Sequence, residues 1–201
     1  MRGMSNSGRP YRDAAPFALV ICGVPASGKS TLAGWAERSM GLPTVNSDKI
    51  RKELAQIKPS DRASPEHYSA SFSQRVYAEL GRRAAARICS HGRVIVDATF
   101  RSRQNREAFA GAFKGAAPIL FVECCAPLDV LLARAEARDR DPARISDANA
   151  EIVASQHSQW QPLDEVQSHQ RVVIDTTLAV EQIWAELTAA IQEFLIRTRT
   201  E

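Results

Sequence analysis

Residues 23–31 constrain the fold of this chain more than any other segment. They match the phosphate-binding loop pattern of glycine, any four residues, and then Gly-Lys-Ser/Thr. The apolar run 17–22 before them is typical of a buried strand, and residues 30–40 after them of a helix. This setting between a strand and a helix distinguishes the loop from a chance match in a Gly/Ser-rich turn. We therefore expect the chain to bind a nucleoside triphosphate.

Each residue type of this loop suits phosphate binding. Gly23 and Gly28 allow backbone angles and a close approach that a Cβ atom would prevent. Backbone N–H groups can then turn inward around a phosphate, together with the N-terminus of the following helix. Lys29 adds a mobile positive charge, and the Ser30 hydroxyl is placed to ligate Mg²⁺. The expected nucleotide-binding residues of the loop are Gly23, Pro25, Ala26, Ser27, Gly28, Lys29, Ser30 and Thr31.

Length and composition predict a single soluble domain. The chain has 201 residues, of which 44% are hydrophobic, and a formal net charge of +3, which does not by itself argue for nucleic acid. No apolar run reaches the ~18 residues of a transmembrane helix, and residues 1–16 lack the apolar core of a signal peptide. We expect a cytoplasmic protein without membrane association, with a disordered leader over 1–16 and one kinase-sized domain over 17–197.

The four cysteines give no sign of a metal site or a disulfide framework. Cys22, Cys89, Cys124 and Cys125 show no Cys-x-x-Cys spacing, and the histidines show no ligand spacing. We expect them to be core thiols of a protein in a reducing compartment.

Apolar runs alternate with helical patterns along the chain. Strands are expected at 17–22, 43–46, 94–97, 119–124 and 172–175, and helices at 30–40, 49–57, 64–92, 103–113, 127–138, 146–160 and from 180 onward. Because the strand runs are continuously apolar, we predict a parallel sheet buried on both faces and joined by right-handed crossovers. The fold class is α/β, with three layers and a five-stranded parallel sheet.

Asp48 is the main candidate for catalysis. A carboxylate after the extended segment 43–46 lies at the sheet edge where ligands bind in open α/β folds. There it could accept the proton of an incoming hydroxyl group. Arg51, one helical turn later, could keep Asp48 ionised or bind a substrate anion. Alternatively, Asp48 only caps a helix, because aspartate is favoured at that position.

Asp97 is a candidate magnesium ligand. It closes the apolar run 94–97 as a Walker-B carboxylate does, and would hold Mg²⁺ beside Ser30, directly or through water. The arginines that follow, Arg101, Arg103 and Arg106, could bind an anionic part of an acceptor or could form a solvated helix face.

A second group of arginines suggests a lid. Its members are Arg134, Arg138, Arg140 and Arg144. An exposed segment rich in arginine suits a lid over a triphosphate, because guanidinium groups neutralise the charge of a transferred phosphoryl group. We expect the lid over about residues 138–146, with Arg138 as its leading candidate, although Asp139 and Asp141 could instead pair these arginines in a surface network. Thr176, after the last strand, is expected beside the phosphate loop as a wall for adenine or ribose, or as part of a helix cap.

Together these residues resemble one branch of the P-loop kinases. The branch contains the phage polynucleotide 5′-kinase, the zeta-toxin kinases and the small ATP-binding kinase domains often joined to aminoglycoside-phosphotransferase-like domains, to which the chain is most similar. The resemblance spans most of residues 17–177 and rests on segments 23–31, 47–51 and 96–100, with the arginine-rich segment and residues 146–148. It implies an adenylate-kinase-like strand order 2-3-1-4-5 and ATP with Mg²⁺ as phosphate donor. It also implies Asp48 as base, Arg51 as its partner or a substrate contact, and Arg138, with Arg134, as lid arginine.

The sequence thus predicts an ATP-dependent kinase that phosphorylates a hydroxyl group of a small molecule, with Lys29 and the lid arginines stabilising the transferred charge. One alternative is a polynucleotide 5′-hydroxyl kinase, which would require a basic channel with stacking aromatic residues. Another is a nucleotide-dependent regulatory module, in which Asp48 and Arg51 would have no task. The sequence indicates no particular protein partner.

Overall fold

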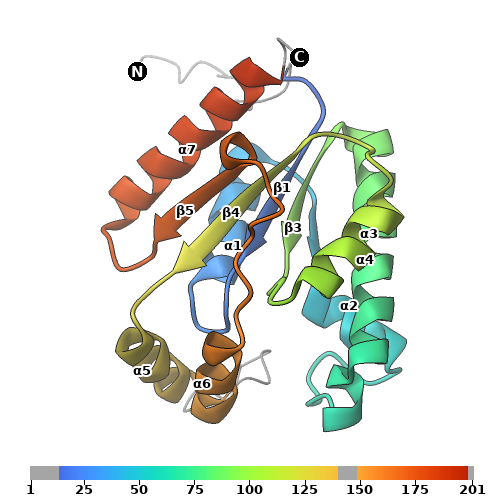
Figure 1. The fold of residues 1–201 in the computed structure, drawn as a ribbon, viewed down its shortest axis with the longest axis vertical. Helices are drawn as coiled ribbons and strands as arrows, with labels where there is room; N and C mark the ends of the chain where they lie inside the picture. Colours follow the sequence, from blue (N-terminus) through green and yellow to red (C-terminus); the bar gives the residue numbers. More distant parts are fainter. Residues whose placement is uncertain (1–13, 140–148, 199–201) are drawn as a thin grey trace, which may run out of the picture.

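The computed structural model describes residues 14–139 and 149–198. Its strands form one parallel sheet in the order β2-β3-β1-β4-β5 (Figure 1). The strands are β1 (Phe17–Cys22), β2 (Thr44–Asn46), β3 (Arg93–Asp97), β4 (Ile119–Cys125) and β5 (Arg171–Asp175). The predicted fold class and strand order are confirmed.

Helices cover both faces of the sheet (Figure 1). They are α1 (Lys29–Met40), α2 (Ser47–Leu54), α3 (Ala70–His91), α4 (Arg103–Phe113), α5 (Leu128–Asp139), α6 (Ala150–Ser158) and α7 (Val180–Arg197), with short 3₁₀ turns η1 (Pro65–Tyr68) and η2 (Ser168–Gln170). Helices α1 and α7 pack on one face, and α3 and α4 on the other. Helices α5 and α6 lie beyond the carboxyl ends of the strands (Figure 1).

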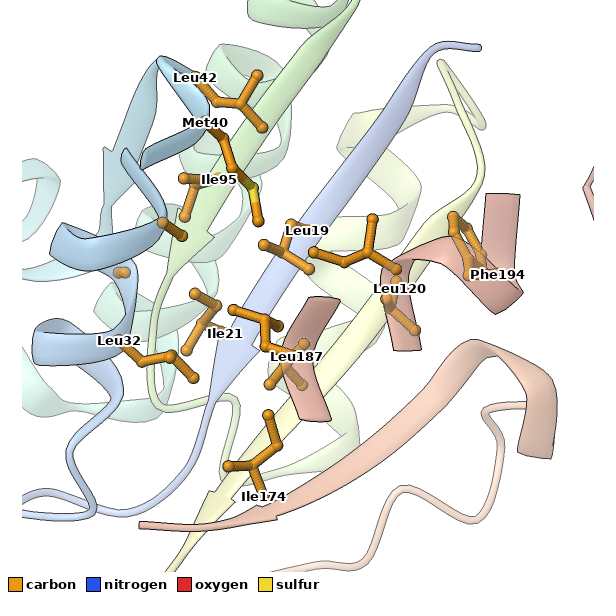
Figure 2. Close-up of a cluster of buried hydrophobic side chains, with 14 of the residues drawn as sticks. Leu19, Ile21, Leu32, Met40, Leu42, Ile95, Leu120, Ile174, Leu187 and Phe194 are labelled. Atoms are coloured by element: carbon orange, nitrogen blue, oxygen red, sulfur yellow. The ribbon is translucent and has the colours of Figure 1, made fainter. Parts of the chain in front are cut away.

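The central strand β1 explains why both faces must be covered. All six of its residues are buried. Phe17, Leu19 and Ile21 belong to the cluster formed with α1 and α7, in which Figure 2 labels Leu19 and Ile21. The alternate residues Ala18, Val20 and Cys22 belong to the cluster formed with α3 and α4. A continuous apolar strand therefore contributes to two cores at once.

A third, smaller cluster supports the carboxyl end of the sheet. It joins Val24 and Ala26 of the phosphate loop to Leu131 and Ala135 of α5 and to Val153 of α6. The phosphate loop is thereby packed against both helices that lie beyond the strands.

The helix predicted over 64–92 is interrupted. Residues 65–68 form only the η1 turn, Ser69 is extended with ψ 155°, and α3 begins at Ala70. The Ser69 Oγ accepts a hydrogen bond from the Phe72 N–H at 3.4 Å, so this serine caps α3 itself. The sequence pattern looked like one continuous helix, but the capping serine at position 69 starts a new helix and so separates η1 from α3.

Parts of the other predictions fall outside the described residues. These include residues 1–13 of the leader, residues 140–148 of the lid with Arg140 and Arg144, and the start of the helix predicted at 146. Of the remaining leader, Ala14 packs against the core, and its carbonyl oxygen accepts a hydrogen bond from Arg93. Within the described residues, no helix is both long and apolar enough to cross a membrane.

The four thiols are free, and they differ in burial. Cys22 and Cys124 are buried, and burial raises the pKa of both thiols, that of Cys124 to about 12. Cys89 lies exposed on α3, so the expectation that it is a core thiol is wrong. Its position on the solvent side of an amphipathic helix is the reason.

Candidate functional site

The phosphate loop leaves β1 with backbone angles that most side chains disfavour. The φ angles of Gly23, Ala26 and Gly28 are 139°, 66° and 87°. A Cβ atom at Gly23 would lie 2.5 Å from the carbonyl oxygen of Cys124. Glycine at this position is thus required both by conformation and by space.

The end of this loop provides unpaired polar groups. The Oγ of Ser27 is buried without a hydrogen-bond partner among the described residues. Helix α1 begins at Lys29, after Gly28, with no side-chain cap from the described residues. The N-terminus of a helix suits an anion, because its first N–H groups have no intrahelical acceptor.

Asn46, and not Asp48, caps α2. The Asn46 Oδ1 accepts hydrogen bonds from the N–H groups of Asp48 and Lys49, at 2.9 and 3.0 Å. The Nδ2 of the same side chain donates to the Oδ2 of Asp97, at 2.9 Å. The interpretation of Asp48 as a simple helix cap is therefore wrong. Its half-buried carboxylate lines a pocket together with Lys29.

Asp97 sits at the carboxyl end of β3 with only 4% of its surface exposed. Burial raises the pKa of this carboxyl group, while the charge of Lys29 and the side chains of Ser30 and Asn46 act in the opposite direction. Its Oδ1 is buried without a hydrogen-bond partner among the described residues. An unpaired carboxylate oxygen in this position fits a divalent cation or its bound water.

The pocket beside Asp48 has a volume of about 580 Å³. Five separate segments line it: the phosphate loop, α2, residues 62–68, residues 99–101 and α6. This volume falls within the ~300–1,000 Å³ of small-molecule sites. The pocket is therefore lined by both a candidate base and the lysine of the phosphate loop.

Arg134 connects α5 to the other side of the phosphate loop. Its Nη1 donates to the Thr176 Oγ1 at 2.9 Å, and its Nη2 to the Thr176 carbonyl oxygen at 2.7 Å. A Cβ atom at Gly28 would lie only 3.3 Å from Thr176, so Thr176 lies beside the phosphate loop as predicted. Arg138, one turn along α5, is half-buried, and burial together with the charge of Arg134 lowers its pKa.

Arg51 supports the pocket wall. Its guanidinium group lies 4.5 Å from the centroid of the Tyr68 ring, and its Nη1 donates to the carbonyl oxygen of His67. Among the described residues no ion pair joins Arg51 to Asp48. Arg51 thus holds η1, which carries part of the pocket wall.

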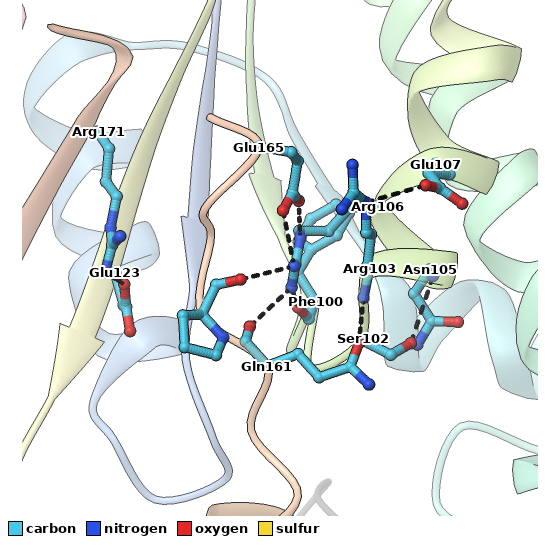
Figure 3. A network of polar contacts seen from close by, with 11 residues as sticks. Phe100, Ser102, Arg103, Asn105, Arg106, Glu107, Glu123, Gln161, Glu165 and Arg171 are labelled. Atoms are coloured by element: carbon cyan, nitrogen blue, oxygen red, sulfur yellow. Dashed lines mark hydrogen bonds and ion pairs between the residues drawn. The ribbon is translucent and has the colours of Figure 1, made fainter. Parts of the chain in front are cut away.

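The three arginines after β3 have different environments, and Figure 3 shows those of Arg103 and Arg106. Arg106 is 4% exposed, pairs with Glu165, and donates to the carbonyl oxygens of Phe100 (2.9 Å), Gln161 (3.1 Å) and Pro162 (2.9 Å). Arg106 is therefore neither free to bind an acceptor nor part of a solvated helix face, because residues 161–165, which return to this side of the sheet after α6, cover its side chain. Arg103 is exposed and pairs with Glu107, and Arg101 lines the pocket.

Sequence reasoning missed several pocket residues. Asn46 could have been recognised, since asparagine is among the best helix caps. Arg62, Tyr68 and Ile152 line the pocket from segments that carry no motif. Only the tertiary fold brings them to Asp48.

Solved structures with similar folds include several kinases. A sugar kinase from Janibacter sp. HTCC2649 superimposes with a TM-score of 0.63 at 18% identity, covering 89% of this chain and 95% of that one. A gluconokinase from Sinorhizobium meliloti 1021 has a TM-score of 0.63 at 20% identity, covering 93% and 98%. A chain of the Pnkp1/Rnl/Hen1 RNA repair complex has a TM-score of 0.57 at 23% identity, covering 76% and 46%. These similarities support the fold.

Sequence comparison with curated proteins finds no match. A family model described as an AAA domain matches residues 19–163. This match includes the phosphate loop, Asp48, Asp97 and residues 161–163 of the segment that covers Arg106. The chain therefore belongs to the AAA-domain family of P-loop proteins.

Proposed function

We propose that the protein is an ATP-dependent phosphotransferase that transfers the γ-phosphoryl group to a hydroxyl group of a small molecule. One observation carries this proposal: Lys29 of the phosphate loop and the carboxylate of Asp48 line the same pocket. A triphosphate held by the loop would direct its terminal phosphate to this pocket, and an alcohol in the pocket would meet a base.

The transfer uses Asp48 to prepare the acceptor. Its carboxylate accepts the proton of the alcohol as the alcohol oxygen bonds to the γ-phosphorus. The bond from that phosphorus to the β–γ bridging oxygen breaks, and ADP leaves with the electron pair. Lys29 and Arg138 stabilise the charge on the transferred group. The absence of a capping role for Asp48 supports this assignment, because its carboxylate remains available.

Ser30 and Asp97 are the residues that would hold Mg²⁺. When bound, this ion would neutralise charge on the β and γ phosphates. The unpaired Oδ1 of Asp97 supports this assignment, and Asn46 fixes the orientation of the other oxygen. Asn46 would thus position both the cation ligand and the helix that bears Asp48.

Arg134 and Arg138 have separate tasks in this proposal. The side chain of Arg134 is engaged by Thr176, so it would shape the nucleotide side of the site with Thr176. Arg138 would contact the phosphates when the lid closes. Arg51 would act by positioning η1 and would not contact the reacting atoms.

A second candidate acceptor is the 5′-hydroxyl end of a nucleic acid strand. The observation favouring it is Tyr68, an aromatic ring that lines the pocket while 41% exposed. This candidate requires an affinity for single strands that weakens steeply with salt. The pocket volume of about 580 Å³, which is in the range of small-molecule sites, favours the small molecule.

The test is transfer of label from γ-labelled ATP to pooled alcohols, sugars, nucleosides and 5′-hydroxyl oligonucleotides. The wild-type protein should label an acceptor faster than it hydrolyses ATP. Asp48→Asn should lower the rate about 10²–10⁴-fold while leaving ATP affinity unchanged. The control Asp164→Asn removes an exposed carboxylate elsewhere and should have no effect. A fully active Asp48→Asn variant, or ATP binding without any transfer, would instead favour a regulatory module.

A further inference from the structure

We propose that the acceptor carries a negatively charged group, bound by Arg62 and Arg101, and an apolar portion held between Tyr68 and Ile152. This inference rests on the proposed phosphotransfer and specifies the substrate class of the same pocket. It depends on the charged and apolar residues that line the rest of the wall of this pocket, besides Lys29 and Asp48.

The charges of this wall are the first observation. Lys29 and Asp48 serve the reaction, and the remaining charged residues of the pocket are Arg62, Arg101 and Glu151. Apart from Lys29 and Asp48, the pocket lining thus contains two guanidinium groups and one carboxylate. Arg62 has no hydrogen bond or ion pair with any other described residue, and neither has Glu151. The positive charge of this wall is therefore not neutralised by ion pairs within the described chain.

The anchoring of Arg101 is the second observation. Its Nη1 donates to the Gln159 side chain, and its carbonyl oxygen accepts a hydrogen bond from the Gln161 N–H at 3.0 Å. These contacts hold the arginine at the pocket and leave other guanidinium donors for a ligand. A carboxylate or a phosphate matches such donors in geometry and charge. A neutral polyol would not compensate two guanidinium groups.

The apolar walls are the third observation. Tyr68 on η1 and Ile152 on α6 are 41% and 37% exposed, so both offer apolar surface to a ligand. They come from segments far apart in the sequence and line the same pocket. Arg51 lies 4.5 Å from the Tyr68 ring centroid and fixes its place. A ligand body between these side chains would cover apolar surface that water now contacts.

The experiment compares three panels of hydroxyl compounds with γ-labelled ATP: hydroxy acids and sugar phosphates, their neutral analogues, and amino alcohols with amino sugars. A 5′-hydroxyl oligonucleotide forms a separate arm. We expect kcat/KM for an anionic compound to exceed that of its neutral analogue by about tenfold or more, as charged hydrogen bonds allow. Higher activity with neutral or cationic compounds would overturn the inference and leave the proposed function intact.

Variants then assign the residues. Arg62→Gln and Arg101→Gln should each raise KM for the anionic compound about tenfold with little change in kcat, and should not affect the neutral analogue. Arg62→Lys should retain most of the preference. Tyr68→Ala should raise KM for both members of a pair. Arg103→Gln, which alters an exposed arginine outside the pocket, is the matched control.

The remaining outcomes are decisive as well. If both arginine variants retain the charge preference, the assignment of Arg62 and Arg101 is overturned. Transfer to the oligonucleotide alone would overturn the small-molecule class. If no arm accepts label faster than water, the proposed function itself fails, and the inference fails with it.

Discussion

The proposed donor side and the proposed acceptor side of this site are built differently. The main part of the proposed donor side is one contiguous segment, residues 23–31, whose φ angles of 139° at Gly23 and 87° at Gly28 set the backbone shape, with Thr176 and Arg134 beside it. The acceptor side combines side chains from α2, η1, the segment after β3 and α6. Nucleotide binding should therefore depend on backbone shape, whereas acceptor choice should respond to single side chains without loss of nucleotide binding.

The largest effect should come from the frame that supports the acceptor side. Arg106→Ala would leave Glu165 and three carbonyl oxygens without their donor in a nearly buried position. We expect a loss of about 3–5 kcal/mol in the free energy of unfolding, measured with urea. The control Arg103→Ala removes an exposed ion pair and should cost at most about 0.5 kcal/mol. Equal losses for the two variants would contradict the assignment of Arg106.

The second-largest effect should come from a substitution that disturbs the backbone of the proposed donor side and weakens ATP binding. Gly23→Ala would impose a strained conformation worth about 1–3 kcal/mol, and its Cβ would meet the Cys124 carbonyl oxygen at 2.5 Å. We expect ATP affinity, measured by calorimetry, to fall more than about tenfold, because a distortion of ~1.4 kcal/mol already has that effect. Gly92→Ala is the control, since Gly92 also has a positive φ but no atom within 4 Å of an added Cβ. It should cost some stability and leave ATP affinity unchanged.

Asp97→Asn should change stability and function in opposite directions. Burial raises the pKa of this carboxyl group, so its charged form is unfavourable in the ligand-free protein. The variant should melt at a higher temperature near neutral pH in the absence of nucleotide. It should also lose about 10–100-fold in magnesium-dependent rate, as disturbed metal sites do. A variant that melts lower and retains full activity would contradict the role proposed for Asp97.

The smallest effect should come from an ion pair away from both sides. Arg82 and Arg83 lower the pKa of Glu79 to about 2 from 4.5. The native state therefore favours the ionised form, and this stability is present above pH ~4.5 and is lost as the pH falls toward 2. Because the side chain of Arg82 is 66% exposed and those of Arg83 and Glu79 are 34% and 20% exposed, solvent screening limits the contribution of these ion pairs to about 0.2–1 kcal/mol. Glu79→Gln should slightly weaken the dependence of unfolding on pH in this window, and no change in activity is expected.

The same difference between the two sides explains how far the sequence could predict the structure. The phosphate loop, its flanking strand and helix, and the apolar strands were recognisable because each signal is local. The position of Thr176 beside Gly28 followed from the parallel topology. The continuously apolar sequence of β1 also predicted that helices cover both faces of the sheet, and the structure confirms this prediction.

The sequence could not predict properties that depend on contacts between distant segments. Arg106 resembled its exposed neighbours until residues 161–165 folded over it. The helical pattern of residues 64–92 concealed the second cap at Ser69, which separates η1 from α3. Arg62 and Ile152 acquired a place in the pocket only through the fold. For Asp48 the sequence left capping and catalysis open, and the hydrogen bonds of Asn46 excluded capping.

The most direct test measures ATP affinity and phosphoryl transfer side by side in Lys29→Met and Asp48→Asn, two changes in the lining of one pocket. We predict that Lys29→Met weakens ATP binding and abolishes transfer, whereas Asp48→Asn binds ATP as the wild type does and loses about 10²–10⁴-fold in transfer. If Asp48→Asn transferred phosphate at the wild-type rate, or lost ATP binding together with transfer, the division of the site into a donor side and an acceptor side would be contradicted.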